Sequence, residues 1–346
     1  MRLRRRKDRQ GGAAEAPRGT TGDDQRGLAE LRAEIERLSD AERTNPDRET
    51  ERRVLRLRHL AGMRLLEADG AGDYAEPAFD RLPTSDGPPE MAPADVTPAV
   101  LRAGILRDGC LLVRGLIPRD EALRLAGQID RAFAERERRE AGDGAVEGYY
   151  EEFVANERHE DPYRPWIKAG GGLLAADSPM LSFEMMELFR AARLPQLVEG
   201  YLGEPPLISV HKTTLRKADP SVPGAWHQDG TFMGDVRSLN LWLSLSRCGD
   251  ESPGLDIVPR RLDRLVTTQT EEALLEIQVS QKKVEEAAGD RPIVRPIFEP
   301  GDALFFDELF LHKTASDPEM PRPRFAIENW FFAASAFPAE YAPIAV

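Results

Sequence analysis

Two histidines and one aspartate have the residue types and part of the spacing of a metal site. His227 and Asp229 are separated by one residue in the segment His227-Gln228-Asp229. In an extended strand, residues i and i+2 point to the same face, so we expect the imidazole and the carboxylate to converge while Gln228 turns away. His312, much later in the chain, supplies a third ligand.

This ligand set indicates a particular metal chemistry. Two histidines and one carboxylate form the facial triad of non-haem Fe(II) enzymes that activate O2, and the triad leaves coordination positions open. A His-x-Asp pair by itself is weak evidence, because so short a pattern arises by chance and its aspartate can equally cap a backbone amide in a surface turn. The same three residues are also compatible with a structural metal or a hydrolytic zinc ion.

An arginine after the distal histidine distinguishes these alternatives. A guanidinium fork suits a carboxylate whose other end is bound to the metal, and neither a structural nor a hydrolytic metal needs such a group. Arg324 begins an alternating segment, and Ala326 leaves room on the same strand face. Arg322 is the rival candidate, and a surface ion pair is the alternative for Arg324. We prefer Arg324 because it leads directly into the strand.

The second half of the chain is predicted to supply the β-structure that positions these residues. Its clearest run is 239–246, in which four leucines alternate with asparagine, tryptophan and serine, so that one face is apolar. Other short extended runs are 207–215, 255–258, 303–306 and 325–332. His211, in the first of these, is predicted to be a wall residue, with a place near the substrate as the alternative. We predict a mainly β domain with flanking helices, an antiparallel barrel or jelly roll.

Residues 97–346 resemble the phytanoyl-CoA dioxygenase-like family of Fe(II)/2-oxoglutarate-dependent oxygenases. The resemblance rests on the segment 106–117, on Trp226 to Asp229, on the strand 239–245, on Gly254-Leu255 ahead of Pro259, and on Pro300-Gly301-Asp302 ahead of His312. It implies a double-stranded β-helix, a cupin-like jelly-roll barrel with helices packed on one side. The residues after Pro259 depart from the family, which commonly has Gly-Ser-His there, so no contact is carried over from that segment.

The resemblance also implies a role for each site residue. His227, Asp229 and His312 match the iron ligands. Arg324 matches the arginine that binds the distal carboxylate of 2-oxoglutarate, and Thr314 matches a position whose hydroxyl often joins it. The implied cofactors are Fe(II), the cosubstrate 2-oxoglutarate and O2. The implied reaction is hydroxylation of a small-molecule metabolite with release of succinate and CO2, whereas desaturation, epoxidation or cyclisation uses the same ligands. A halogenase needs a vacant position, which Asp229 occupies.

Residues 1–96 lie outside the resemblance. We predict a disordered basic tail over 1–26, which has almost no large apolar side chain. Apolar residues recur at three- and four-residue steps over 27–68, which predicts two amphipathic helices. Their apolar stripes either pack on the same chain or pair two subunits in a homodimer, and His59 is expected on the solvated face. The proline- and glycine-rich segment 69–96 is predicted to be a linker or a surface arm. Further helices are expected over 97–107 and from 118 to about 139.

Composition limits the partners and the location. Lys and Arg number 47 against 60 Asp and Glu, and the net charge of -13 argues against nucleic acid as a partner. No apolar run approaches the roughly 20 residues that span a bilayer, and the N-terminus lacks the apolar stretch of a secretory signal. The two cysteines, Cys110 and Cys248, are too few for a disulfide framework. We therefore predict a cytoplasmic enzyme without a membrane partner.

Overall fold

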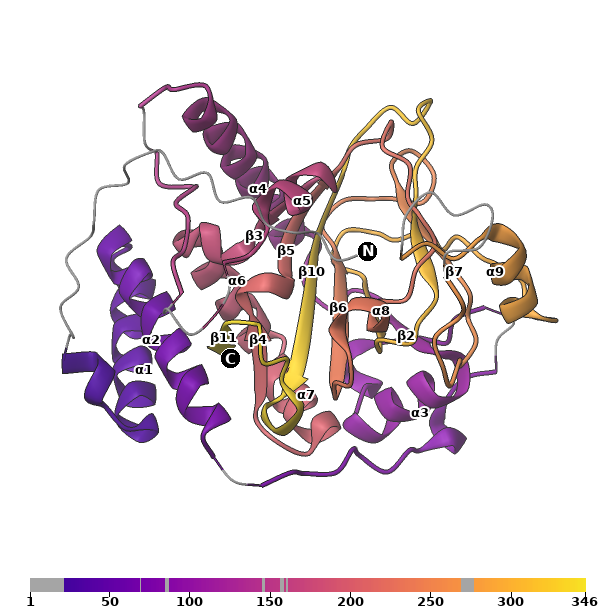
Figure 1. The fold of residues 1–346 in the computed structure, drawn as a ribbon, viewed down its shortest axis with the longest axis horizontal. Coiled ribbons are helices and arrows are strands. Elements are labelled where there is room, and N and C mark those ends of the chain that lie inside the picture. The colour runs from indigo at the N-terminus through magenta and orange to yellow at the C-terminus, as the bar shows by residue number, and fades with distance from the viewer. Residues whose placement is uncertain are drawn as a thin grey trace, which may run out of the picture.

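The computed structural model describes residues 22–68, 70–84, 87–144, 147–155, 159, 161–268 and 277–346. Within these ranges the chain forms a large mixed β-sheet, a small two-stranded sheet and helices that pack beside them (Figure 1). In Figure 1 the helices α1 (Leu28–Thr44), α2 (Arg48–Leu66) and α6 (Pro179–Ala191) lie to one side of the central strand β10 (Arg324–Ala333). On the other side lie β7 (Gly254–Ile257) and α9 (Gln281–Ala288).

Nine of the described strands form the large sheet. Its hydrogen-bonded order is β1 (Glu90–Met91), β2 (Cys110–Val113), β8 (Ala303–Phe306), β6 (Ser238–Ser244), β10, β4 (Pro206–Ser209) and β11 (Pro343–Ala345). In addition, β5 (Thr213–Ala218) pairs with both β10 and β3 (Gly172–Leu174). All of these pairs are antiparallel except β1 with β2. The small sheet pairs β7 with β9 (His312–Ala315). The prediction of β-structure with flanking helices is confirmed at this coarser level. The described strands do not close into the predicted barrel.

The run 207–215 is two strands and not one. The Ser209 hydroxyl accepts a hydrogen bond from the Lys212 N–H at 3.0 Å, which turns the chain through the 3-10 helix Val210–Lys212 between β4 and β5. Serine competes for backbone N–H groups in this way at turns, so an alternating apolar pattern does not continue the strand through it. Lys212 therefore belongs to this turn and not to the alternation of β5, which begins at Thr213.

Strand β6 is buried on both faces, whereas its alternation predicts one apolar face. Its leucines pack into the main hydrophobic core. On the other face, Trp242 and Asn240 are register partners of Glu328 and Trp330 in β10. Asn240 is also the register partner of Phe306 in β8. We call this polar and aromatic side of the sheet the inner face, and it is the side that meets the metal ligands.

Two helices begin and end within about one residue of the positions predicted as 97–107 and 118 to about 139. Helix α3 (Pro98–Asp108) is capped by the Thr97 hydroxyl, which accepts a hydrogen bond from the Val100 N–H at 3.3 Å. It ends at Gly109, whose φ of 77° is a left-handed conformation that glycine adopts without strain. The other helices here are α4 (Arg119–Glu140), α5 (Arg164–Ala169) and α7 (Leu194–Leu202).

The two N-terminal helices pack on their own chain. Leu31 of α1 and Leu57 of α2 are fully buried in one cluster that also contains Leu207 of β4 and Ala345 of β11. Of the two alternatives for the apolar stripes, the structure therefore shows packing within the chain, and those stripes give no support to a homodimer. The prediction for His59 is wrong, because its side chain is buried and its Nδ1 lies 2.7 Å from the Pro343 carbonyl oxygen.

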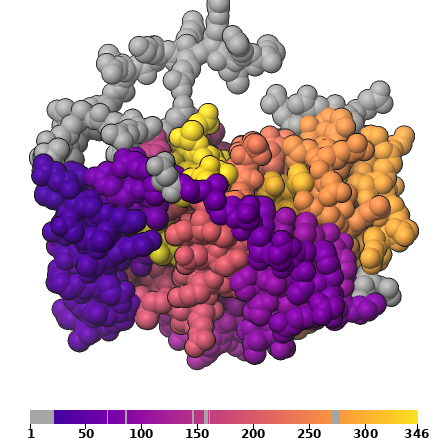
Figure 2. Space-filling view, turned by 90° about the horizontal axis from the view of Figure 1, so that it is seen from below, coloured from indigo at the N-terminus to yellow at the C-terminus, as the bar shows by residue number. Residues whose placement is uncertain are grey.

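The segment between α2 and α3 follows the surface of the molecule. Figure 2 shows the chain crossing this face from the N-terminal helices towards α3. The Ala75 and Ala78 N–H groups donate to the carbonyl oxygens of Tyr201 and Ala99 at 3.1 and 3.0 Å, and β1 adds to the edge of the sheet. The predicted tail falls mainly on residues 1–21, outside the described residues, while Gly22–Gln25 form a 3-10 helix. Among the described helices, none has the length and apolar character to cross a bilayer.

Candidate metal centre

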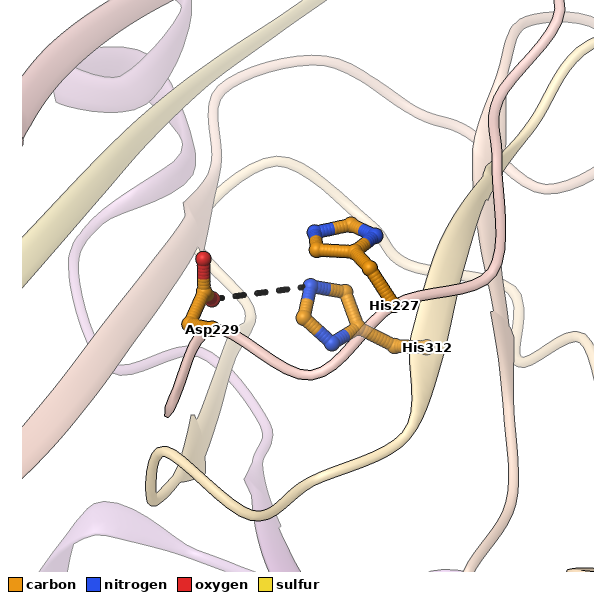
Figure 3. Close-up of side chains that lie close together, drawn as sticks. All are labelled: His227, Asp229 and His312. Atoms are coloured by element: carbon orange, nitrogen blue, oxygen red, sulfur yellow. Dashed lines mark ion pairs between the residues drawn. The ribbon is translucent and has the colours of Figure 1, made fainter. Parts of the chain in front are cut away.

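The side chains of His227, Asp229 and His312 converge on one point (Figure 3). Each offers one ligand atom, and these atoms all lie within 4.8 Å of one another. The two imidazole centroids are 4.5 Å apart, and Nε2 of His312 is 4.0 Å from Oδ2 of Asp229. A single ion at the centre of this group is within reach of all three side chains.

A backbone bridge brings the two histidines together across a long stretch of sequence. The His227 N–H donates to the His312 carbonyl oxygen at 3.0 Å, and the His312 N–H donates back at 3.2 Å. His312 is the first residue of β9, so His227 continues the edge of the small sheet. This antiparallel pair fixes the relative position of the two rings.

Asp229 reaches the site through a turn, which corrects the predicted geometry. Its φ of -63° and ψ of -25° are helical, and it immediately precedes the short helix α8 (Gly230–Met233). The Gly230 N–H donates to the Glu308 carbonyl oxygen at 2.9 Å and fixes this turn. The extended i, i+2 alternation therefore does not place the carboxylate, although the predicted convergence with His227 occurs.

Gln228 turns away from the ligands, as predicted, and holds the surrounding loops. Its side chain is buried, and its Nε2 donates to the Leu309 carbonyl oxygen at 2.6 Å. Its Oε1 accepts a hydrogen bond from the Val266 N–H at 2.6 Å. Gln228 thus connects the His-x-Asp turn to the loop that leads into His312, a positioning role that the sequence pattern does not indicate.

The hydrogen bonds of both imidazoles leave the correct nitrogen free for a metal. Nδ1 of His227 lies 2.8 Å from the Ala225 carbonyl oxygen, and Nδ1 of His312 lies 3.1 Å from that of Phe310. Because a carbonyl only accepts, Nδ1 carries the proton in each ring and the Nε2 lone pair is available. Burial lowers the pKa of His312 to about 4, so its ring is neutral near pH 7, as a metal ligand must be. The donor set therefore fits a divalent transition metal.

The two candidate arginines lie in very different surroundings. Arg324 is 1% exposed, and its Nη1 donates to the Gly254 carbonyl oxygen at 3.1 Å. Its guanidinium carbon lies 5.2 Å from the centre of the Trp242 ring on the inner face. The Arg322 side chain is 72% exposed and lies 3.4 Å from Glu251 in a surface ion pair. Burial beside the inner face favours Arg324 as the anion-binding residue. Thr314 is partly buried in β9, two residues after His312.

Glu328 is a charged residue of this site that the sequence analysis did not identify. Its Oε2 accepts a hydrogen bond from Nε of Arg216 at 2.7 Å, and its Oε1 lies 3.7 Å from Nη2 of Arg324. Burial opposes its charge, but the two guanidinium groups lower the pKa of Glu328 below its ordinary value. Its carboxylate is also within electrostatic range of Asp229 and His312. Alternation along β10 puts Glu328 on the same strand face as Arg324, so the sequence alone could have predicted that Glu328 lies near this arginine.

The segment that departs from the expected family pattern supports the site from outside. Arg260 donates to the Ala288 carbonyl oxygen at 3.0 Å, at the end of α9. Arg261 forms an ion pair with Asp307, in the loop between β8 and His312. Arg261 therefore anchors the loop of the distal ligand, and Arg260 attaches the same segment to the end of α9.

Comparison with known proteins places this site in a family. The family model described as phytanoyl-CoA dioxygenase (PhyH) matches residues 105–317, which is more than half of the chain. The chain belongs to this family. Its members are Fe(II)- and 2-oxoglutarate-dependent oxygenases, so the protein is an oxidoreductase whose cofactors are Fe(II), 2-oxoglutarate and O2. The earlier resemblance is thereby confirmed.

Comparison with solved structures finds matches at low sequence identity. EctD from S. alaskensis, crystallised with 2-oxoglutarate and 5-hydroxyectoine, is 18% identical, with a TM-score of 0.50 over 78% of this chain and 85% of that one. The epimerase SnoN, in complex with Fe3+, alpha ketoglutarate and nogalamycin RO, is 21% identical, with a TM-score of 0.42 over 69% and 85% of the two chains. No curated protein sequence matches this one significantly. The likeness to EctD establishes the fold and carries no information about the substrate.

Proposed function

We propose that this protein is a 2-oxoglutarate-dependent dioxygenase that hydroxylates a small-molecule metabolite with release of succinate and CO2. The observation that carries the proposal is the convergence of His227, Asp229 and His312 within 4.8 Å of one another, with Nε2 free on both rings. The buried Arg324 beside the inner face adds an anchor for a dicarboxylate. We also propose that the two sheets are those of a double-stranded β-helix, and that the protein works in the cytoplasm without a nucleic-acid or membrane partner.

Three side chains would hold the metal in this proposal. His227 and His312 would bind Fe(II) through Nε2 and Asp229 through a carboxylate oxygen, and bound Fe(II) with 2-oxoglutarate and O2 supplies the oxidising power for attack on a C–H bond. The carbonyl groups of Ala225 and Phe310 hold the imidazoles in the ligating tautomer. Because both rings are fixed before the metal arrives, little ordering is left to occur on binding.

Other side chains would hold the cosubstrate and exclude water. Arg324 would bind the distal carboxylate of 2-oxoglutarate, with the Thr314 hydroxyl as a second donor. Glu328 keeps its hydrogen bond to Arg216 and therefore does not need Arg324 in order to remain paired. The Phe306 ring lies 4.9 Å from the His312 ring and 5.9 Å from that of Trp330, both centroid to centroid. This aromatic packing shields the back of the metal centre from solvent.

The test is succinate release by the purified protein with Fe(II) and 2-oxoglutarate under air. A metabolite panel is then scored for stimulated succinate release and for product mass, with Asp229→Ala as the inactive control. A product that gains one oxygen atom supports hydroxylation. A product that loses two hydrogens indicates desaturation or cyclisation with the same ligands. Absence of succinate from the metal-loaded protein would favour a non-catalytic metal-binding protein and refute the proposal.

A further inference from the structure

Lys212 lies close to the metal centre, and none of the described carboxylates forms an ion pair with it. It is the last residue of the 3-10 helix between β4 and β5, and its side chain is partly buried. Its Nζ lies 3.6 Å from the centre of the Phe232 ring. The ammonium group forms no ion pair and no hydrogen bond with any residue that the structure describes. Burial lowers the pKa of Lys212 to about 8, which indicates that its charge is poorly compensated.

Lys212 lies between α8 and the charged residues of the inner face. Phe232 belongs to α8, which directly follows Asp229, and its side chain is 39% exposed. The charges that act on Lys212 are those of Asp229, Glu328 and Arg216. The lysine therefore lies between a partly exposed aromatic ring and the charged inner face.

The charges of the site leave room for one more anion. Three cations, Lys212, Arg216 and Arg324, face two carboxylates, Asp229 and Glu328. In the loaded enzyme of the proposed function, the dianionic 2-oxoglutarate balances Fe(II). One positive charge is then unmatched, and Lys212 is the cation among the three that lacks a carboxylate partner. An unpaired, partly buried charge is costly, so a ligand that pairs with it gains affinity.

The neighbouring wall is aromatic. His211 stacks on Tyr341 with ring centroids 5.0 Å apart and an interplanar angle of 11°. Burial and the nearby Asp229 carboxylate raise the pKa of Tyr341 to about 12, so its hydroxyl stays protonated close to the metal ligands. Lys212 thus has aromatic rings on two sides, because its Nζ lies over Phe232 and its chain neighbour His211 stacks on Tyr341. Such surroundings suit a molecule with one carboxylate and an apolar body.

We propose that Lys212 is a specificity-determining residue that binds a carboxylate of the substrate and thereby selects anionic metabolites. This inference rests on the proposed function, because the pairing of charges assumes that Fe(II) and 2-oxoglutarate occupy the site. It goes further by naming the chemical class of the substrate and the residue that recognises it. Lys212 would hold the carboxylate beside the Phe232 ring, so that the apolar body extends towards the metal.

The test compares a charged probe with a neutral one of the same shape. Protein loaded with Fe(II) and 2-oxoglutarate is kept free of O2 so that no turnover occurs, and phenylacetate and phenylacetamide are titrated by calorimetry. We expect the wild-type protein to bind phenylacetate at least tenfold more tightly than the amide. Lys212→Met and Lys212→Gln should bind the two probes equally. Lys217→Met is the matched control and should retain the preference, because Lys217 lies nearby in β5 but pairs with Asp130 at 2.6 Å.

Each outcome decides for or against the inference. The assignment of Lys212 is overturned, and the proposed function is not, by any of three results. The wild-type protein does not bind phenylacetate, it shows no preference for phenylacetate over the amide, or the preference survives in both folded Lys212 variants. Failure of the wild-type protein to bind Fe(II) and 2-oxoglutarate in the first titration would instead refute the proposed function, and this inference with it. Thermal unfolding of each variant shows whether it is folded, and two neutral replacements of different polarity keep the test decisive.

Discussion

Replacing Arg324 with methionine should weaken 2-oxoglutarate binding without loss of the metal. Methionine keeps an unbranched side chain of similar length and removes the charge. A charge-assisted hydrogen bond contributes about 1.5–3 kcal/mol, and every 1.4 kcal/mol is roughly a tenfold change in Kd. Glu328 lies 3.7 Å from the same guanidinium and competes for it, so we expect the lower part of that range. The Kd of 2-oxoglutarate should therefore rise about 10- to 40-fold.

The assay is an oxygen-free titration of Fe(II)-loaded protein with 2-oxoglutarate, after a separate titration with Fe(II) alone. Iron affinity should stay within about twofold, because Arg324 contacts backbone carbonyls and Glu328 and none of the three ligands. Arg322→Ala is the control, since an exposed ion pair contributes only about 0–1 kcal/mol. If Arg322→Ala weakens the cosubstrate and Arg324→Met does not, the choice of arginine is wrong.

Three further predictions concern the metal, a buried carboxyl and the N-terminus. His227→Ala, Asp229→Ala and His312→Ala should each abolish succinate release and reduce iron binding while the chain stays folded, and full activity of Asp229→Ala would remove that residue from the metal. Burial raises the pKa of Glu51 from 4.5 to about 7. The free energy of unfolding is therefore not reduced by Glu51 below about pH 4.5, where the carboxyl is protonated in both states, and it falls as the pH rises through 7 and the buried carboxyl must ionise. Glu51→Gln should therefore raise the free energy of unfolding by about 1–3 kcal/mol at pH 8 and leave it nearly unchanged at pH 4, measured by urea denaturation. Deleting residues 1–26 should leave the chain folded and succinate release unchanged. The described end of this segment contributes no apolar side chain and contacts α2 only through polar groups, such as Asp23 with Arg53 and the Asp24 carbonyl oxygen with Arg64. Lost turnover would assign the tail a role in substrate binding.

Local rules predict the elements that depend on neighbours in the sequence. Thr97 followed by proline predicts the start of α3, because the hydroxyl caps an N–H three residues later. Alternation in 239–246 predicts β6, and the same alternation from Arg324 predicts β10. These rules fail where a side chain interrupts the backbone pattern, as Ser209 does between β4 and β5.

The sequence by itself determined which ligand types are present and, through its motifs, the family to which they belong. Only the tertiary structure decided how those ligands meet. The His227–His312 bridge joins residues far apart in the chain, and the turn at Asp229 is fixed by a hydrogen bond from Gly230 to the carbonyl of Glu308. That Lys212 forms no ion pair with the described residues likewise depends on distances to groups on other elements. Periodicity assigns a residue to a face of its own strand or helix, but packing alone determines which distant charges share that face.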